Sequence, residues 1–246
     1  MAMSQEAADD YVKRADSLKI DLFGTAAITF HEPKMRNRED RFYFGGNPAE
    51  QKAFDAALDQ LIEGTEFTAF GVAIRKDAYR EEFLATGIDP YLPLDVYSLA
   101  IQMLLERYVD FLAYSVARPM GIVSFESIGP KEDAEHQRDF ADLLLHGTQW
   151  VPDSAFRNHL VTGARFEPKA GSAPSELADM WARDLFEWGR AECVGEPGRF
   201  NLFEGRIYCR GDLQLGKFGV KVFPDSTIRE RIQDHRLKVA GMRTGN

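Results

Sequence analysis

The chain of 246 residues has little cysteine and no long apolar run. Its two cysteines, Cys193 and Cys209, are too few for a disulfide framework or a cysteine-only zinc site, and free cysteines are typical of a reducing compartment. No stretch approaches the roughly 20 apolar residues of a membrane span, and the polar residues 1–7 do not resemble a signal peptide. We therefore expect a soluble, cytoplasmic protein with no membrane partner.

Basic residues are also in deficit, with 30 Lys and Arg against 39 Asp and Glu and a formal net charge of -9. This balance argues against a surface that binds nucleic acid through a global basic field, although a local basic cleft stays open. The sequence shows neither an internal repeat nor a low-complexity linker. We therefore expect a single domain over residues 1–246, with a C-terminal extension from about residue 191.

The hydrophobic pattern predicts alternating helices and strands. Helices are expected over residues 7–22, 48–64, 95–116, 131–145 and 174–190. Strands are expected over residues 26–30, 41–44, 67–74, 121–126, 147–151, 160–166, 206–210 and 218–224. On the long third helix, the predicted inward stripe is Tyr97, Ala100, Met103, Leu104, Tyr108, Phe111 and Leu112. The pattern is that of an α/β protein with a mixed sheet.

Glu126 is the first candidate functional residue, because it lies near the carboxyl end of an apolar strand. Ligands of open α/β sheets collect beyond the carboxyl ends of the strands. The structural alternative is a carboxylate in solvent, paired with a nearby arginine.

Asp179 is the second candidate and lies on the predicted helix of residues 174–190. A carboxylate at a strand end and another on a helix can together hold a hard divalent cation. The alternative is a solvated helix face, because Asp179 and Arg183 have the spacing of a surface ion pair and Glu176 lies on the same stripe.

Lys169 precedes that helix in a loop rich in Gly, Ser and Pro, where a lysine can meet a phosphate as a point charge. An ordinary loop lysine is the alternative. The five histidines show no metal-ligand spacing, and only His31 stands at a predicted strand end. There is no phosphate-binding glycine-rich loop.

Short motifs in a defined order carry a family resemblance across residues 18–224. They are Leu18-Lys-Ile-Asp-Leu-Phe-Gly24, Ile28-Thr-Phe-His31, Phe125-Glu-Ser-Ile-Gly129 with Lys131-Glu-Asp133, Phe166-Glu-Pro-Lys169 followed by Glu176-Leu-Ala-Asp179, and Gly219-Val-Lys-Val-Phe-Pro224. This order resembles the prokaryotic domain-of-unknown-function 3800 family, whose members look like ribonuclease H-like proteins.

The resemblance implies a ribonuclease H-like mixed sheet flanked by helices and a Mg- or Mn-dependent phosphodiester hydrolase, that is, a nuclease. Glu126 and Asp179 would be its metal ligands and catalytic residues, and Lys169 would offset phosphate charge. It further implies nucleic acid as a partner and a context of mobile elements or phage defence.

The chain also departs from the family pattern. Family members open with a strand carrying Asp-Glu-Ser-Gly, whereas this chain begins at the helix that would follow, and Ile128 and Glu176 replace an Arg and a Gln. The resemblance therefore implies a missing N-terminal strand, as in a piece of a longer protein. The alternative function is a non-catalytic binding or assembly module with an incomplete metal site. Its open sheet edge would be completed by a homo-oligomer or a partner protein.

Overall fold

The computed structural model describes residues 1–81, 95–117, 119–168, 173–191, 198–209 and 219–224. The helices are α1 (Gln5–Phe23), α2 (Glu32–Asn37), the 3-10 helix η1 (Asp40–Gly46), α3 (Pro48–Glu63), α4 (Lys76–Tyr79), α5 (Val96–Tyr114), α6 (Pro130–His146), α7 (Asp153–His159), α8 (Ala173–Arg190) and α9 (Phe200–Glu204). The strands are β1 (Gly71–Ile74), β2 (Ser124–Glu126), β3 (Arg165–Glu167) and β4 (Val220–Phe223). Within these residues, no helix has the length and apolar character to cross a membrane.

Local capping explains where the long helices begin and end. The Ser4 hydroxyl accepts the Ala7 N–H at 3.1 Å ahead of α1, and Gly24 ends α1 with a left-handed φ of 75°. Asn47 caps α3 immediately before its first residue, Pro48, and Asp95 caps α5 by accepting the Ser98 N–H. These boundaries are therefore encoded locally.

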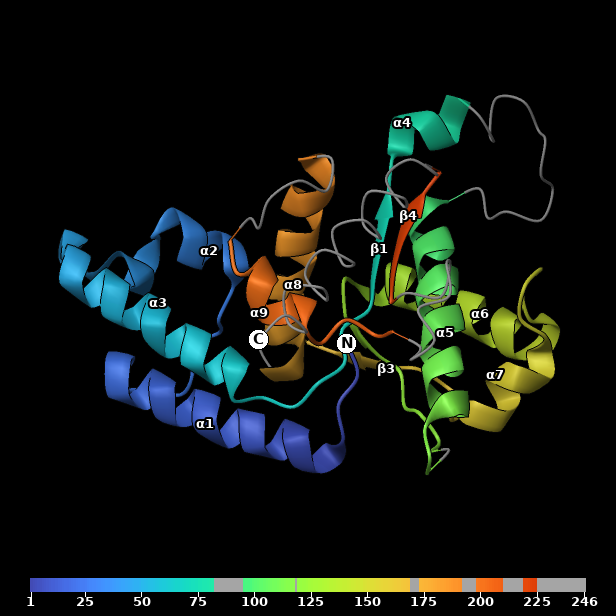
Figure 1. Cartoon of the computed structure of the whole chain (residues 1–246), viewed down its shortest axis with the longest axis horizontal. Coiled ribbons are helices and arrows are strands. Elements are labelled where there is room, and N and C mark those ends of the chain that lie inside the picture. Colours follow the sequence, from blue (N-terminus) through green and yellow to red (C-terminus); the bar gives the residue numbers. More distant parts are fainter. Residues whose placement is uncertain (82–94, 118, 169–172, 192–197, 210–218, 225–246) are drawn as a thin grey trace, which may run out of the picture.

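Strands β1 and β4 form a parallel ladder between two helices (Figure 1). On one face α8 approaches closely, because a Cβ at Gly71 would collide with the Leu185 side chain. On the other face, Leu99 and Met103 of α5 pack against Val72 and its neighbours in β1. The ladder is thus the middle of three layers, and its two faces are covered by helices.

Strands β2 and β3 form a second parallel ladder, which pairs Phe125 with Phe166 and Glu126 with Glu167. The two phenylalanine rings stack with centroids 5.6 Å apart. Phe125 packs against the core that α5, α6 and α7 build on one side of the molecule (Figure 1). The face of this ladder that carries the phenylalanines is therefore the packed one.

The larger core lies on the opposite side, where α1, α2 and α3 meet α8 and α9 (Figure 1). Its fully or almost fully buried members include Tyr11, Phe30, Phe54, Leu177, Trp181, Phe200 and Phe203. Residues from the predicted C-terminal extension contribute to it, because α9 packs on α8 and β4 pairs with β1.

A buried ion pair connects α1, α8 and the segment between α1 and α2. The Lys19 ammonium lies 2.9 and 3.0 Å from the two carboxylate oxygens of Glu176, and both side chains are 5% exposed. Glu176 also accepts the Phe30 N–H at 3.0 Å, and Lys19 lies 4.8 Å from the centre of the Phe30 ring. One carboxylate thus holds two separate segments.

The predicted helices are all present, but several predicted strands are wrong. Residues 26–30 form no strand, residues 41–44 belong to the 3-10 helix η1, and residues 147–151 form no strand. Helices α2, α4, α7 and α9 were not predicted. Both observed ladders are parallel, and the antiparallel component of the predicted mixed sheet is limited, among described residues, to the Ala2–Thr68 bridge.

The predicted inward stripe of α5 is confirmed except at its first residue. Met103 and Leu112 are buried, whereas Tyr97 is 62% exposed. Helix α5 packs against β1 on one side and against α6 and α7 on another. Residues outside a single stripe, such as Leu105 and Val109, are consequently buried.

We expect Lys19→Met to destabilise the fold by about 3–5 kcal/mol, because it leaves the Glu176 carboxylate buried without its counter-charge. In Lys19→Met/Glu176→Gln the amide still accepts the Phe30 N–H, so most of the lost stability should return. Urea unfolding measures both effects. The exposed pair of Arg14 and Asp10 supplies the control, since Asp10→Asn should cost less than about 1 kcal/mol. An equally small loss of unfolding free energy in Lys19→Met would contradict a stabilising role of Lys19 as the counter-charge of Glu176.

Candidate functional site

Two carboxylates lie side by side at the carboxyl ends of β2 and β3. Glu126 and Glu167 are paired in register. Side chains alternate along a strand, so Glu126 shares its face with Ser124, whose hydroxyl donates to Glu167 Oε1 at 3.3 Å. Both carboxylates therefore occupy the face opposite the stacked phenylalanines.

The turn after Glu126 is held by hydrogen bonds. The Ser127 N–H donates to the Glu167 carbonyl at 2.8 Å, which extends the ladder past the acidic pair. The Ser127 hydroxyl and the Ile128 N–H both donate to the Asp133 carboxylate in the first turn of α6. The Ser127 bond is the main reason that the pKa of Asp133 lies below its usual range. The strand end thus continues directly into α6, and Asp133 of this helix holds the connecting turn.

Glu167 received no role from the sequence, although the sequence contains a signal for it. Strand β2 ends in Phe125-Glu126 and β3 ends in Phe166-Glu167. When two parallel strands pair through their phenylalanines, the glutamates that follow must be neighbours too. The repeated Phe-Glu end is therefore the pattern that identifies the second carboxylate.

Asp179 lies on α8, where one of its oxygens accepts the N–H of Glu32 at 3.1 Å. It thereby satisfies a backbone donor in the first turn of α2. The alternative surface pair with Arg183 does not form; Arg183 pairs with Glu187. The helix stripe is not a solvated face either, because Glu176 on the same stripe is buried.

His31 and Lys169 are the remaining residues that the sequence singled out. His31 precedes α2 at its N-cap position and lies outside any strand, which corrects its expected place at a strand end. Lys169 lies outside the described residues. The strand register pairs Glu126 with Glu167. Asp179, in contrast, is hydrogen-bonded to the first residue of α2. Among the described residues there is no group of three or more His, Cys, Asp and Glu that could hold a metal ion.

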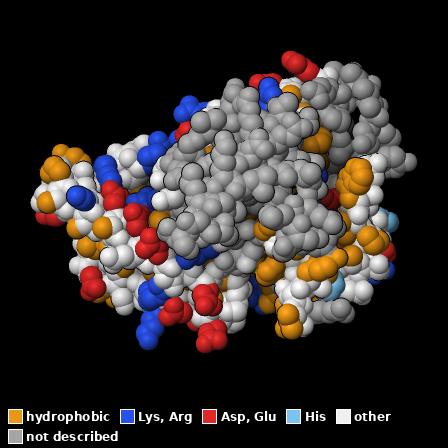
Figure 2. Space-filling view, viewed as in Figure 1, with side chains coloured by type: hydrophobic (Ala, Val, Ile, Leu, Met, Phe, Trp, Pro, Cys, Tyr) orange, Lys and Arg blue, Asp and Glu red, His pale blue; other side chains and the backbone are white. Residues whose placement is uncertain are grey.

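A charged pocket of about 640 Å³ lies between α2, α3 and α8, and Glu32 forms part of its wall. Its charged lining residues are Glu32, Asp55, Asp184, Glu187, Arg36, Arg38, Arg183 and Arg199. Acidic and basic side chains are intermixed over this side of the molecule (Figure 2). The charges of the pocket largely neutralise one another: Arg38 and Arg199, for example, both bind the Asp55 carboxylate.

Asp184 is the titratable group of this pocket whose pKa departs most from its usual value. Burial raises the pKa of Asp184 to about 7, and the hydrogen bond from the Arg199 N–H, at 3.2 Å, offsets part of this rise. With a pKa near neutrality, the charge of Asp184 changes around pH 7. Its hydrogen bond from the Arg199 N–H gives this carboxyl group a structural role.

Three comparisons bear on this site. No family model matches the chain, no curated protein matches it, and no solved structure matches it.

Asp184 should make stability depend on pH. Its folded pKa is raised from 3.8 to about 7, so its contribution is fully present below about pH 4 and is lost as the pH rises through 7. Between pH 5 and pH 8 we expect the free energy of unfolding to fall by about 2–3 kcal/mol more in the wild type than in Asp184→Asn. Urea unfolding at both pH values measures this. The exposed-site control Asp142→Asn should retain the wild-type slope, and a wild-type slope in Asp184→Asn would refute the assignment.

Proposed function

We propose that the chain is a divalent-metal-dependent phosphodiester hydrolase of the nuclease type, related to the domain-of-unknown-function 3800 family that its motifs resemble. The observation that carries the proposal is the pairing of Glu126 with Glu167 at the ends of two parallel strands. The carboxyl ends of strands are where open α/β sheets place their ligands.

Two adjacent carboxylates fit Mg²⁺ or Mn²⁺, because both ions prefer oxygen ligands. Mg²⁺ in particular is often held by only one or two carboxylates, with water and substrate phosphate completing its shell. When bound, such an ion activates a water molecule and stabilises the leaving oxygen of a phosphodiester. The pair thus meets the minimum that this chemistry requires of the protein.

The surrounding residues have complementary roles in the proposal. Arg165 shares the face of Glu167 by strand alternation and is exposed, so it can attract a phosphate. Lys169 follows Glu167 by two residues and would offset phosphate charge. Asp179 lies outside this pair: its carboxylate accepts the Glu32 N–H of α2, and the described residues contain no group of three carboxylates that could hold a metal ion.

A nucleic acid is the substrate class that suits this arrangement. With a net charge of -9, the protein has to attract phosphates locally, through Arg165 and Lys169, rather than through its overall field. Mobile elements and phage defence are the proposed biological context, on the strength of the family resemblance.

Cleavage of labelled DNA and RNA with added Mg²⁺ or Mn²⁺ tests the proposal. We expect Glu126→Gln and Glu167→Gln each to lower the rate by about 100-fold or more, because each removes a charged oxygen ligand and keeps the side-chain shape. Glu135→Gln, an exposed carboxylate on α6, is the matched control and should retain the wild-type rate. Undiminished cleavage by Glu126→Gln and Glu167→Gln would sink the proposal.

A non-catalytic binding module is the second candidate, and one observation favours it. Two of the acidic side chains of α8, Glu176 and Asp179, already bind groups inside the fold. In that case Asp179→Ala should cost about 1 kcal/mol of stability through loss of the α2 cap, and Asp179→Asn much less. The wild type would then cleave neither substrate with either metal. Metal-dependent cleavage by the wild type excludes this candidate.

A further inference from the structure

The outer edge of β1 has backbone groups directed away from β4. The Gly71 N–H donates to the carbonyl of Gly219, just before β4, and the Arg75 N–H donates to the carbonyl of Phe223 in β4, each at 2.8 Å. Because alternate residues of a strand bond to the same neighbour, Val72 and Ile74 direct their N–H and C=O groups to the opposite edge. In the part of the chain that the structure describes, no strand pairs with that edge at these two residues.

One backbone bridge lies on this edge just before β1 begins. Ala2 and Thr68 exchange two backbone hydrogen bonds of 2.8 Å in an antiparallel bridge. Phe70 is the next residue whose backbone groups point to this edge, and its carbonyl accepts the indole N–H of Trp181 at 2.7 Å. The edge therefore continues from one strand-like rung, through a side-chain bond, to the two residues without a strand partner.

A groove of about 700 Å³ runs along this edge and is lined by every residue from Phe70 to Arg75. One wall is α8, through Trp181, Leu185 and the 56% exposed Phe186. Leu104 of α5 lies on the other side. The wall is apolar along most of its length, as an interaction surface would be.

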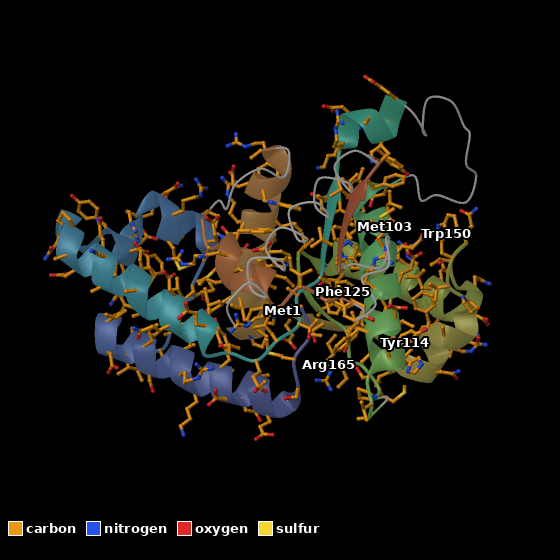
Figure 3. All side chains as sticks on the ribbon, in the orientation of Figure 1. Met1, Met103, Tyr114, Phe125, Trp150 and Arg165 are labelled. Atoms are coloured by element: carbon orange, nitrogen blue, oxygen red, sulfur yellow. The ribbon has the colours of Figure 1, made fainter. Side chains whose placement is uncertain are left out.

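The shape of the groove determines what can enter it. Met1 lines the groove and lies near the middle of the molecule, between the two groups of helices (Figure 3). Because residues of α8 and of α5 line the groove, a single extended segment fits it better than a sheet that carries its own covering helices.

Direction specifies the segment further. Arg75, Asp77 and Arg190 line the groove beyond the end of β1, where Arg190 is paired with Glu187. A segment that continues the antiparallel direction of the Ala2–Thr68 rung would have its N-terminal end at this position. Because α8 supplies most of the apolar wall, alternate side chains of the segment should be apolar.

We propose that the outer edge of β1 binds an extended segment of a partner protein. The segment has apolar side chains at alternate positions. It continues the ladder that Ala2 begins, so main-chain hydrogen bonds supply affinity and the α8 wall supplies selectivity. This binding site is separate from the strand-end carboxylates and does not require the proposed hydrolase.

A designed peptide is the probe. A fluorescein-labelled Glu-Val-Thr-Val-Thr-Val peptide should bind the full chain saturably, as measured by fluorescence anisotropy without added metal. A peptide with Pro in place of both Thr residues lacks two N–H donors and should bind at least about tenfold more weakly. Hydrogen exchange at the amides of Val72 and Ile74 should slow when the first peptide is bound.

Ala182→Arg is the decisive variant, because Ala182 is exposed on α8 and lines the groove. We expect it to weaken peptide binding at least about tenfold. Ala56→Arg, at an exposed alanine of α3 outside the groove, is the matched control and should bind as the wild type does.

Three results would overturn the proposal: no saturable binding up to about 1 mM peptide, undiminished binding by Ala182→Arg, or equal binding of the proline peptide. Light scattering adds a fourth. If the wild type alone forms a dimer that Ala182→Arg dissociates, the occupant is a second copy of this chain and not another protein.

Discussion

The buried contact between Lys19 and Glu176 is the constraint on which the rest of the structure depends. Burying two charges is costly, and such a pair persists only where good geometry and further hydrogen bonds offset the loss of water. Here Glu176 binds both Lys19 and the Phe30 N–H, and burial still raises its pKa above the usual range. The pair connects α1 and the 25–31 segment to the first turn of α8, which fixes where α8 starts.

From that point α8 determines two other parts of the molecule. One turn further on, Asp179 accepts the first N–H of α2, and beyond it Trp181 and Leu185 pack on β1. The same helix follows β3, whose last residue is Glu167. Helix α8 thus follows the strand that ends in Glu167 and also forms a wall of the groove beside β1.

The helices could be predicted from the sequence because their signals are local. Ser4, Asn47 and Asp95 cap the helices that follow them, and the apolar stripe of α3 is buried as its spacing indicates. Residues 26–30 have the alternation of a strand, yet the Phe30 N–H bonds to a carboxylate 146 positions away. Glu167 likewise becomes a site candidate only once the register of β2 and β3 is known. Long-range polar contacts and strand register are thus what the sequence pattern does not encode.

Calorimetric titration of Mn²⁺ into the full chain tests whether Glu126 and Glu167 together hold a divalent cation. We expect saturable binding by the wild type, its loss in Glu126→Gln/Glu167→Gln, and its retention in the surface control Glu135→Gln. Absence of binding in the wild type, or unchanged binding in the double variant, would show that the two glutamates do not form a cation site.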